Sequence, residues 1–291
     1  MRNPLLELSN EPGYEGLRDL ALTLEKIANK IDRFGGRVVL PNLYLSTQDG
    51  YDMETILVAL EETLIELRLF HFNHSMRHYC LSLDYSEEST LESISSFPAF
   101  KTLFDAMEEE LSRFGAPYEG ILAVDITDWV VKSATTEAKF LDFLRYMADV
   151  DERTLAIYIE RSGSEEKAEI ARKSLVAKTR LENVVVKLKS PQIALKILEN
   201  ELSSFGFSML EESKEKIVET LDIVLKVKGQ EGPWTIRQLA EDIVYHAYRE
   251  GEDLHTELSL DDLKTFLPGG SWITDFTAKK RYFMGLIGEV D

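Results

Sequence analysis

The order of apolar runs and amphipathic segments constrains the fold of this chain more than any other feature of its sequence. Five apolar runs alternate with segments of helical periodicity as far as residue 188, and only helical periodicity follows. The expected strands cover residues 37–45, 77–85, 118–126, 153–161 and 182–188. Runs that are almost continuously apolar are typical of strands covered on both faces. The pattern therefore predicts an α/β fold with a five-stranded parallel sheet flanked by helices, followed by a small all-helical domain.

Helical periodicity sets the expected domain boundaries. Between the strands we expect helices over residues 14–33, 53–69, 89–114, 136–149 and 164–177. The later helices are expected over residues 191–206, 211–228, 235–250 and about 260–266. We divide the chain into an α/β domain at residues 1–189, a helical lid domain at 190–267 and an apolar C-terminal tail at 268–291. The tail is too apolar to stay in solvent, so we expect it to pack on the helical domain or on a neighbouring subunit.

The net charge of the chain limits the classes of partner that it can bind. Fifty-two acidic residues against 33 basic ones give a formal net charge of −19, which disfavours nonspecific binding to nucleic acid and to anionic membranes. The densest basic run, Lys279–Arg281, has only three members. Cys80 is the only cysteine, so no disulfide framework is expected and a reducing cytoplasm is the natural location. No apolar stretch approaches the length needed to span a bilayer.

Residues 40–67, LPNLYLSTQDGYDMETILVALEETLIEL, have the layout of a nucleotide-binding element. An apolar strand enters a short polar loop, and an amphipathic helix follows at once. A phosphate-binding loop, GxxxxGK[ST], uses glycines to aim backbone N–H groups at the phosphates, a lysine to neutralise them and a hydroxyl to hold magnesium. Here the loop has a single glycine, and no lysine occurs between Lys30 and Lys101.

The order of elements, with several local stretches, resembles an AAA+ ATPase module. GILAVDI (120–126) resembles its Walker B strand, PWTIRQLAEDIVYHAY (233–248) its lid helix, and LSLDDLKTFL (258–267) its usual ending. Residues 154–188 are similar to its fourth strand, connecting helix and fifth strand. Among AAA+ groups the chain looks most like the CbxX type of remodelling ATPases. The resemblance covers about residues 14–267, and it implies a P-loop fold that binds ATP and assembles into rings.

The residues that carry AAA+ chemistry are missing from the matching positions. In the phosphate loop Thr47 and Asp52 stand in place of the two motif glycines, and Gly50 matches an internal position. Met53 replaces the lysine and Glu54 replaces the Ser or Thr. Carboxylates therefore point toward the place of a polyanion; at an effective dielectric of about 20, two like charges at 4 Å repel by roughly 4 kcal/mol. The alignment predicts a degenerate Walker A motif.

The remaining AAA+ positions are similarly altered. Asp125 keeps the Walker B aspartate, but Ile126 replaces the catalytic glutamate that orients the attacking water. The first sensor would fall near Glu160, Arg161 or Ser162, and Trp234 occupies the second-sensor arginine position. Three basic residues remain as candidates for sensor or trans-acting roles: Arg237, one turn beyond Trp234, and Lys178 and Arg180, before the fifth strand.

Other interpretations of these patterns remain open. The strand–loop–helix at 40–67 also suits an unrelated α/β fold that never bound nucleotide. His71, His74 and His78 are spaced as zinc ligands on a helix would be, but they fall where a helix gives way to a strand, which favours a polar loop. We therefore assign no metal, no cofactor and no catalytic residue.

The sequence predicts a catalytically inactive AAA+-like protein, a pseudo-ATPase. It would act through protein–protein interaction as a scaffold, a regulator or a noncatalytic ring subunit, and its partner would be an active AAA+ paralogue or copies of itself. One alternative is an ATP-binding remodelling ATPase with an unorthodox site. Another is a homo-oligomeric structural protein that never meets nucleotide.

Overall fold

The computed structural model divides into two compact units. One consists of Met1–Thr47 with Asp52–Val186, and the other of Gln48–Tyr51 with Lys187–Asp291. We call them the sheet unit and the helical unit. The structure describes residues 2–34, 40–48, 50–69, 78–82, 120–127, 130, 154–161, 165–177, 180–188, 190–227, 232–250 and 256–277.

The sheet unit is built on a five-stranded parallel sheet with the order β2-β3-β4-β1-β5. The strands are β1 (Asn42–Ser46), β2 (His78–Ser82), β3 (Gly120–Asp125), β4 (Thr154–Glu160) and β5 (Leu181–Val185). In register, Leu45 lies beside Ile159 of β4 and Val184 of β5. The predicted α/β fold with a parallel sheet is confirmed.

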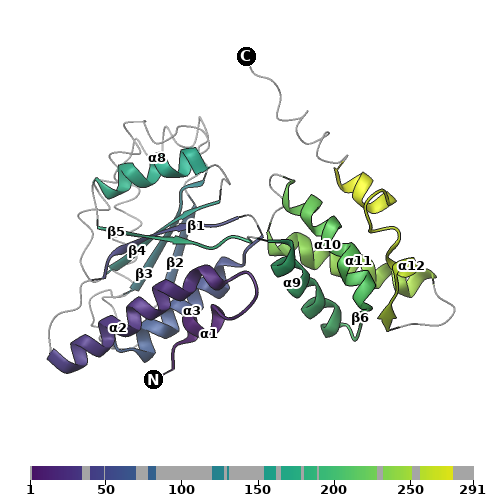
Figure 1. Ribbon diagram of the computed structural model, residues 1–291. Coiled ribbons are helices and arrows are strands. Elements are labelled where there is room, and N and C mark those ends of the chain that lie inside the picture. The colour runs from purple at the N-terminus through teal and green to yellow at the C-terminus, as the bar shows by residue number, and fades with distance from the viewer. Residues whose placement is uncertain are drawn as a thin grey trace, which may run out of the picture. The chain divides into compact units, whose positions relative to one another are not determined.

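Helices cover both faces of this sheet (Figure 1). On one face lie α1 (Pro4–Leu8), α2 (Arg18–Phe34) and α3 (Met53–Glu66), with the short 3-10 helix η1 (Glu15–Leu17) before α2. On the other face lies α8 (Glu165–Val176). Successive side chains of a strand point to opposite faces. Accordingly Leu43 and Leu45 line a small void together with Leu20 of α2 and Leu60 of α3. Tyr44, between them in β1, points to the other face, where its hydroxyl donates to the Ala168 carbonyl of α8.

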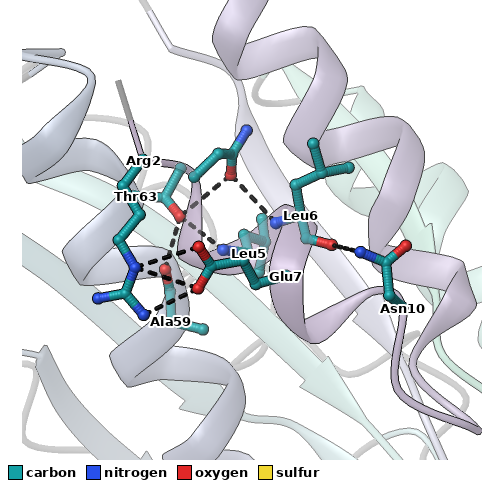
Figure 2. Close-up of polar contacts among 8 residues, drawn as sticks. Arg2, Leu5, Leu6, Glu7, Asn10, Ala59 and Thr63 are labelled. Atoms are coloured by element: carbon teal, nitrogen blue, oxygen red, sulfur yellow. Dashed lines mark hydrogen bonds and ion pairs between the residues drawn. The ribbon is translucent and has the colours of Figure 1, made fainter.

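Helix α1 has only five residues, and side chains satisfy the free N–H groups of its first turn (Figure 2). The Asn3 side chain caps the helix by accepting from the Leu6 N–H at 3.1 Å. Thr63 of α3 accepts from the buried Leu5 N–H at 2.8 Å, and its hydroxyl donates to the Ala59 carbonyl at 2.8 Å. A helix this short is not stable alone. Its position on α3 therefore depends on Thr63 and on the fully buried Leu5 side chain.

We expect Thr63→Val to lower the free energy of unfolding by about 1–3 kcal/mol, because the buried Leu5 N–H loses its acceptor. Thr63→Ser keeps the acceptor and removes one buried methyl group, for a loss of about 0.8 kcal/mol. The Leu5 amide separates the two effects. Its hydrogen exchange should accelerate in Thr63→Val and stay protected in Thr63→Ser; equal protection in both variants would show that Thr63 does not hold α1.

The helical unit packs three long helices around one apolar core. They are α9 (Pro191–Ser204), α10 (Glu211–Leu225) and α11 (Pro233–Glu250), followed by α12 (Leu260–Leu263). The Ser190 side chain caps α9 and Ser259 caps α12 in a reciprocal capping box with Asp262. Two strands of two residues each, β6 (Ser208–Met209) and β7 (Glu257–Leu258), pair in parallel.

The first part of the apolar tail packs on this core. Residues 271–277 are helical, and Ile273 is buried in the cluster that α9, α10 and α11 form. Trp272 stacks on Phe276 with ring centroids 5.0 Å apart, and its Nε1 donates to Asp242 of α11 at 2.7 Å. The rest of the tail, from residue 278, lies outside the described residues.

Several predicted boundaries differ from the structure. The fifth strand ends at Val185 rather than at residue 188, and α10 ends at Leu225 rather than at 228. Helix α1 and the β6–β7 pair were not predicted. The helices expected over 89–114 and 136–149 lie outside the described residues. In the part of the chain that the structure describes, no helix is both long enough and apolar enough to cross a bilayer.

Candidate functional site

The strand order places a topological switch point between β1 and β4 of the sheet unit. The chain leaves β1 toward β2 at one edge of the sheet and leaves β4 toward β5 at the other edge. In open α/β sheets, ligands bind beyond the carboxyl ends of the strands at such a point. The residues there are Ser46, which ends β1, with Thr47 after it, and Glu160, which ends β4, with Arg161 after it.

Backbone and side-chain hydrogen bonds tie the ends of β1 and β4 together. The Thr47 N–H donates to the Glu160 carbonyl at 2.8 Å, and the Ser46 hydroxyl donates to Glu160 Oε2 at 3.2 Å. Glu160 and Thr47 are fully buried. Burial, with the Glu160 carboxylate as a second cause, raises the pKa of the nearby Tyr44 phenol. Glu160 thus stands at the predicted first-sensor position as an inward-facing, hydrogen-bonded carboxyl group.

Asp125, which the sequence analysis aligns with the Walker B aspartate, forms an ion pair with an arginine of the same unit. Arg161 Nη2 lies 3.0 Å from Asp125 Oδ2, and the exposed fractions of the two side chains are 28% and 17%. The other oxygen, Oδ1, accepts from the Thr127 N–H at 3.0 Å, and the Thr127 hydroxyl accepts from the Arg161 N–H at 3.0 Å. A magnesium ion at Asp125 would have to displace a guanidinium that already neutralises the carboxylate.

Ile126, at the position of the catalytic glutamate, is a core residue. Its side chain is fully buried, and its N–H donates to the Ile159 carbonyl at 2.9 Å. It continues the β3–β4 pairing one residue beyond Asp125. The position therefore offers neither a general base nor a group that could orient a water molecule.

The N-terminus of α3, where a phosphate-binding loop would place its ligand, already holds an anion from the chain. Asp52 is the N-cap: its Oδ1 accepts from the Glu54 N–H at 3.1 Å, and its Oδ2 accepts from the Thr55 hydroxyl at 2.7 Å. Helix N-termini attract anions because of their free N–H groups and the helix dipole. Met53, at the position of the lysine, is 8% exposed and begins the core-facing stripe of α3.

Residues 48–51, which connect β1 to α3, belong to the helical unit, and Gln48 and Gly50 each make a contact there. The Leu188 N–H donates to the Gln48 side chain, Oε1, at 2.7 Å. Gly50 has φ = +92°, and a Cβ added to it would lie 2.7 Å from the Trp234 Cβ and 3.1 Å from the Trp234 backbone N. The first turn of α11 therefore lies directly against the one glycine of the loop.

The two candidate arginines differ in their surroundings. Arg237 of α11 forms an ion pair with Glu201 of α9, Nε to Oε1, at 3.0 Å. That pair joins two helices of the helical unit, as an ordinary structural salt bridge would. Arg180 is exposed just before β5, where its carbonyl accepts from the Asn42 N–H at 2.9 Å. Lys178 and Ser162 lie outside the described residues.

Within the described ranges, no group of three or more His, Cys, Asp or Glu side chains is arranged to hold a metal ion. His78 and Cys80 lie in β2, opposite Ile121 and Ala123 of β3. His71 and His74 of the predicted polar loop fall outside the described residues.

Sequence reasoning located most of these positions and missed how they are connected. It placed Asp125 and Arg161 each at the end of a strand, but not the ion pair between them. The signal was available: two oppositely charged residues ending strands that become neighbours. It also missed the approach of Trp234 to Gly50, which no spacing in the sequence encodes.

With this geometry established, solved structures identify the class of fold. The structure of the FIGL-1 AAA domain matches with a TM-score of 0.52 at 16% sequence identity, over 97% of this chain and 91% of that chain. The fold is accordingly AAA+-like: a parallel α/β domain followed by a helical region, similar to AAA+ ATPases. At this level of identity the likeness shows the fold alone.

Among particular proteins, RuvB of Thermotoga maritima, a Holliday junction branch migration motor, is also similar. Its TM-score is 0.46 at 11% identity, over 85% of this chain and 67% of that chain. No protein-family model matches the chain, and no curated protein matches it. The chemistry has to be inferred from the residues of the site.

Proposed function

We propose that this chain is a pseudo-ATPase: an AAA+-like protein that acts by binding another protein rather than by hydrolysing ATP. The observation that carries the proposal is the Asp52 carboxylate at the N-terminus of α3, in the place where a nucleotide phosphate would bind. An incoming phosphate would have to displace that carboxylate and would find no lysine, because Met53 is buried there.

Two further contacts support the same proposal. The Asp125–Arg161 ion pair occupies the carboxylate that would hold magnesium, and Ile126 lies in the core instead of serving as a base. In the helical unit, Trp234 lies against Gly50. Groups of the chain itself thus occupy the N-terminus of α3 and the Asp125 carboxylate, the two places where a phosphate and a magnesium ion would bind.

The role that follows is that of a scaffold, a regulator or a noncatalytic subunit in the cytoplasm. Its partner would be an active AAA+ protein or further copies of this chain, and its surfaces would carry the function. The narrower assignment to the CbxX type rests on the sequence stretches 120–126, 154–188 and 233–267 alone.

Titration with a fluorescent ATP analogue and Mg²⁺ tests the proposal. We expect no saturable binding up to about 1 mM, a dissociation constant that corresponds to only about 4 kcal/mol of binding free energy. We also expect no release of inorganic phosphate. An intact P-loop ATPase measured under the same conditions is the control. Micromolar binding that unlabelled ATP displaces would contradict the proposal and support the unorthodox ATPase.

A further inference from the structure

A groove on the sheet unit runs between α1 and α3, next to the contacts of Figure 2. Its volume is about 460 Å³. The lining combines apolar and acidic side chains: Arg2, Pro4, Glu7, Leu8, Glu11, Glu54, Thr55, Val58, Ala59 and Glu62. Val58 is 37% exposed and contributes apolar surface to the lining. The groove thus offers an apolar surface bordered by carboxylates.

The groove already binds one guanidinium, that of Arg2. Its Nη2 lies 2.8 Å from Glu7 Oε2, and its Nε donates to both Glu7 oxygens at 3.1 Å. The hydrogen bond to Glu7 raises the pKa of Arg2, and the charges of Glu62 and Glu66 raise it further. Arg2 is the only basic residue among the lining residues, against four carboxylates. The remaining negative charge of the lining should attract further cationic groups.

The chain contains one segment with the complementary chemistry. Residues 279–287, KKRYFMGLI, join three consecutive basic residues to two aromatic and three large apolar ones, in a chain whose net charge is −19. Guanidinium and ammonium groups match the carboxylates, and Tyr282 and Phe283 match the apolar lining. The segment follows the helical residues 271–277. Fully extended, the ten residues 278–287 span about 34 Å.

We propose that the α1–α3 groove of one copy binds residues 279–287 of a second copy of this chain. This inference rests on the proposed function and deepens it, because it names the partner and the two surfaces. Groove and segment are different surfaces of one chain, so the contact is head-to-tail and builds rings or open chains of copies rather than a two-fold dimer.

Peptide binding tests the match of groove and segment. The receptor is the full chain with Lys279→Glu, Lys280→Glu and Arg281→Glu, whose own tail cannot compete, and the probe is a fluorescent peptide of residues 278–291. We expect saturable binding that weakens with added salt. Glu11→Lys with Glu62→Lys should weaken it about tenfold or more, from loss and reversal of two exposed charge contacts.

The matched control reverses two exposed carboxylates of the helical unit, Glu215→Lys and Glu241→Lys, and should leave binding unchanged. Circular dichroism verifies that each variant is folded. Absence of binding, or an equal loss in the control pair, overturns the proposal.

Light scattering tests whether the partner bound in the groove is a second copy of this chain. The mean mass of the wild-type chain should rise with concentration, whereas the tail variant and the groove variant should each remain at the mass of one chain. Mixing these two variants pairs reversed tails with reversed grooves and should restore assembly. Peptide binding by a wild-type chain that stays monomeric overturns the assignment to a second copy. None of these measurements uses nucleotide. The pseudo-ATPase proposal is therefore tested separately, by the ATP titration.

Discussion

Gly50→Ala should lower the free energy of unfolding by about 2–5 kcal/mol. At φ = +92° an L-residue is strained, at a cost of roughly 1–2 kcal/mol. The added Cβ would also meet the Trp234 Cβ at 2.7 Å and the Trp234 backbone N at 3.1 Å. The backbone of α11 cannot move aside as the end of a flexible side chain can, so overpacking adds about 1–3 kcal/mol. Urea denaturation followed by far-ultraviolet circular dichroism measures the loss.

Gly206→Ala is the matched control for this prediction. Gly206 ends α9 with φ = +83°, and a Cβ added there meets no atom within 4 Å. Its replacement should therefore cost only the conformational strain, about 1 kcal/mol. The difference between the two variants measures how closely Trp234 approaches Gly50. Equal losses would mean that the loop does not contact α11, and the account of residues 48–51 would be wrong.

The parallel sheet was predictable because each of its strands leaves a mark in its own stretch of sequence. Strands covered on both faces have to be apolar along their length, and the five runs were visible as such. Helix α1 was not predicted, since five residues are too few to show helical periodicity. Its cap, Asn3 followed by Pro4, was the available signal.

The sequence predicted which catalytic side chains are missing from the candidate site, but not the contacts that the residues present there make. Alignment with the motif showed that Met53 and Ile126 could not do the chemistry of lysine and glutamate. It did not show that both side chains are buried, or that Asp52 caps α3. The burial depends on how strands distant in sequence are ordered, and no spacing along one chain specifies that order. The cap is local, and Asp52 directly before Met53 was its available signal.

Arg161→Met should lower the free energy of unfolding by about 2–3 kcal/mol, because it leaves the largely buried Asp125 carboxylate without its ion-pair partner. The expected value is below that for fully buried pairs because both side chains retain some contact with solvent. Combining it with Asp125→Asn removes the charge that was left unpaired, and should recover at least 1 kcal/mol relative to the sum of the two single losses. Urea denaturation of the wild type, both single variants and the double variant measures this coupling. Strictly additive losses would show that the pair is not formed.

The same Arg161→Met chain separates two explanations for the inactive nucleotide site that we propose. If Arg161 alone displaced magnesium from an otherwise intact site, its removal would free Asp125 and give Mg²⁺-dependent binding of the ATP analogue. We expect no such gain, because Asp52 still caps α3 and Met53 still provides no positive charge. A phosphate has to be attracted before a metal can bridge it to the protein, and the loop supplies carboxylates where attraction is needed. Saturable, magnesium-dependent binding by Arg161→Met would therefore contradict the proposal that the whole loop prevents nucleotide binding, and would assign that effect to the single ion pair.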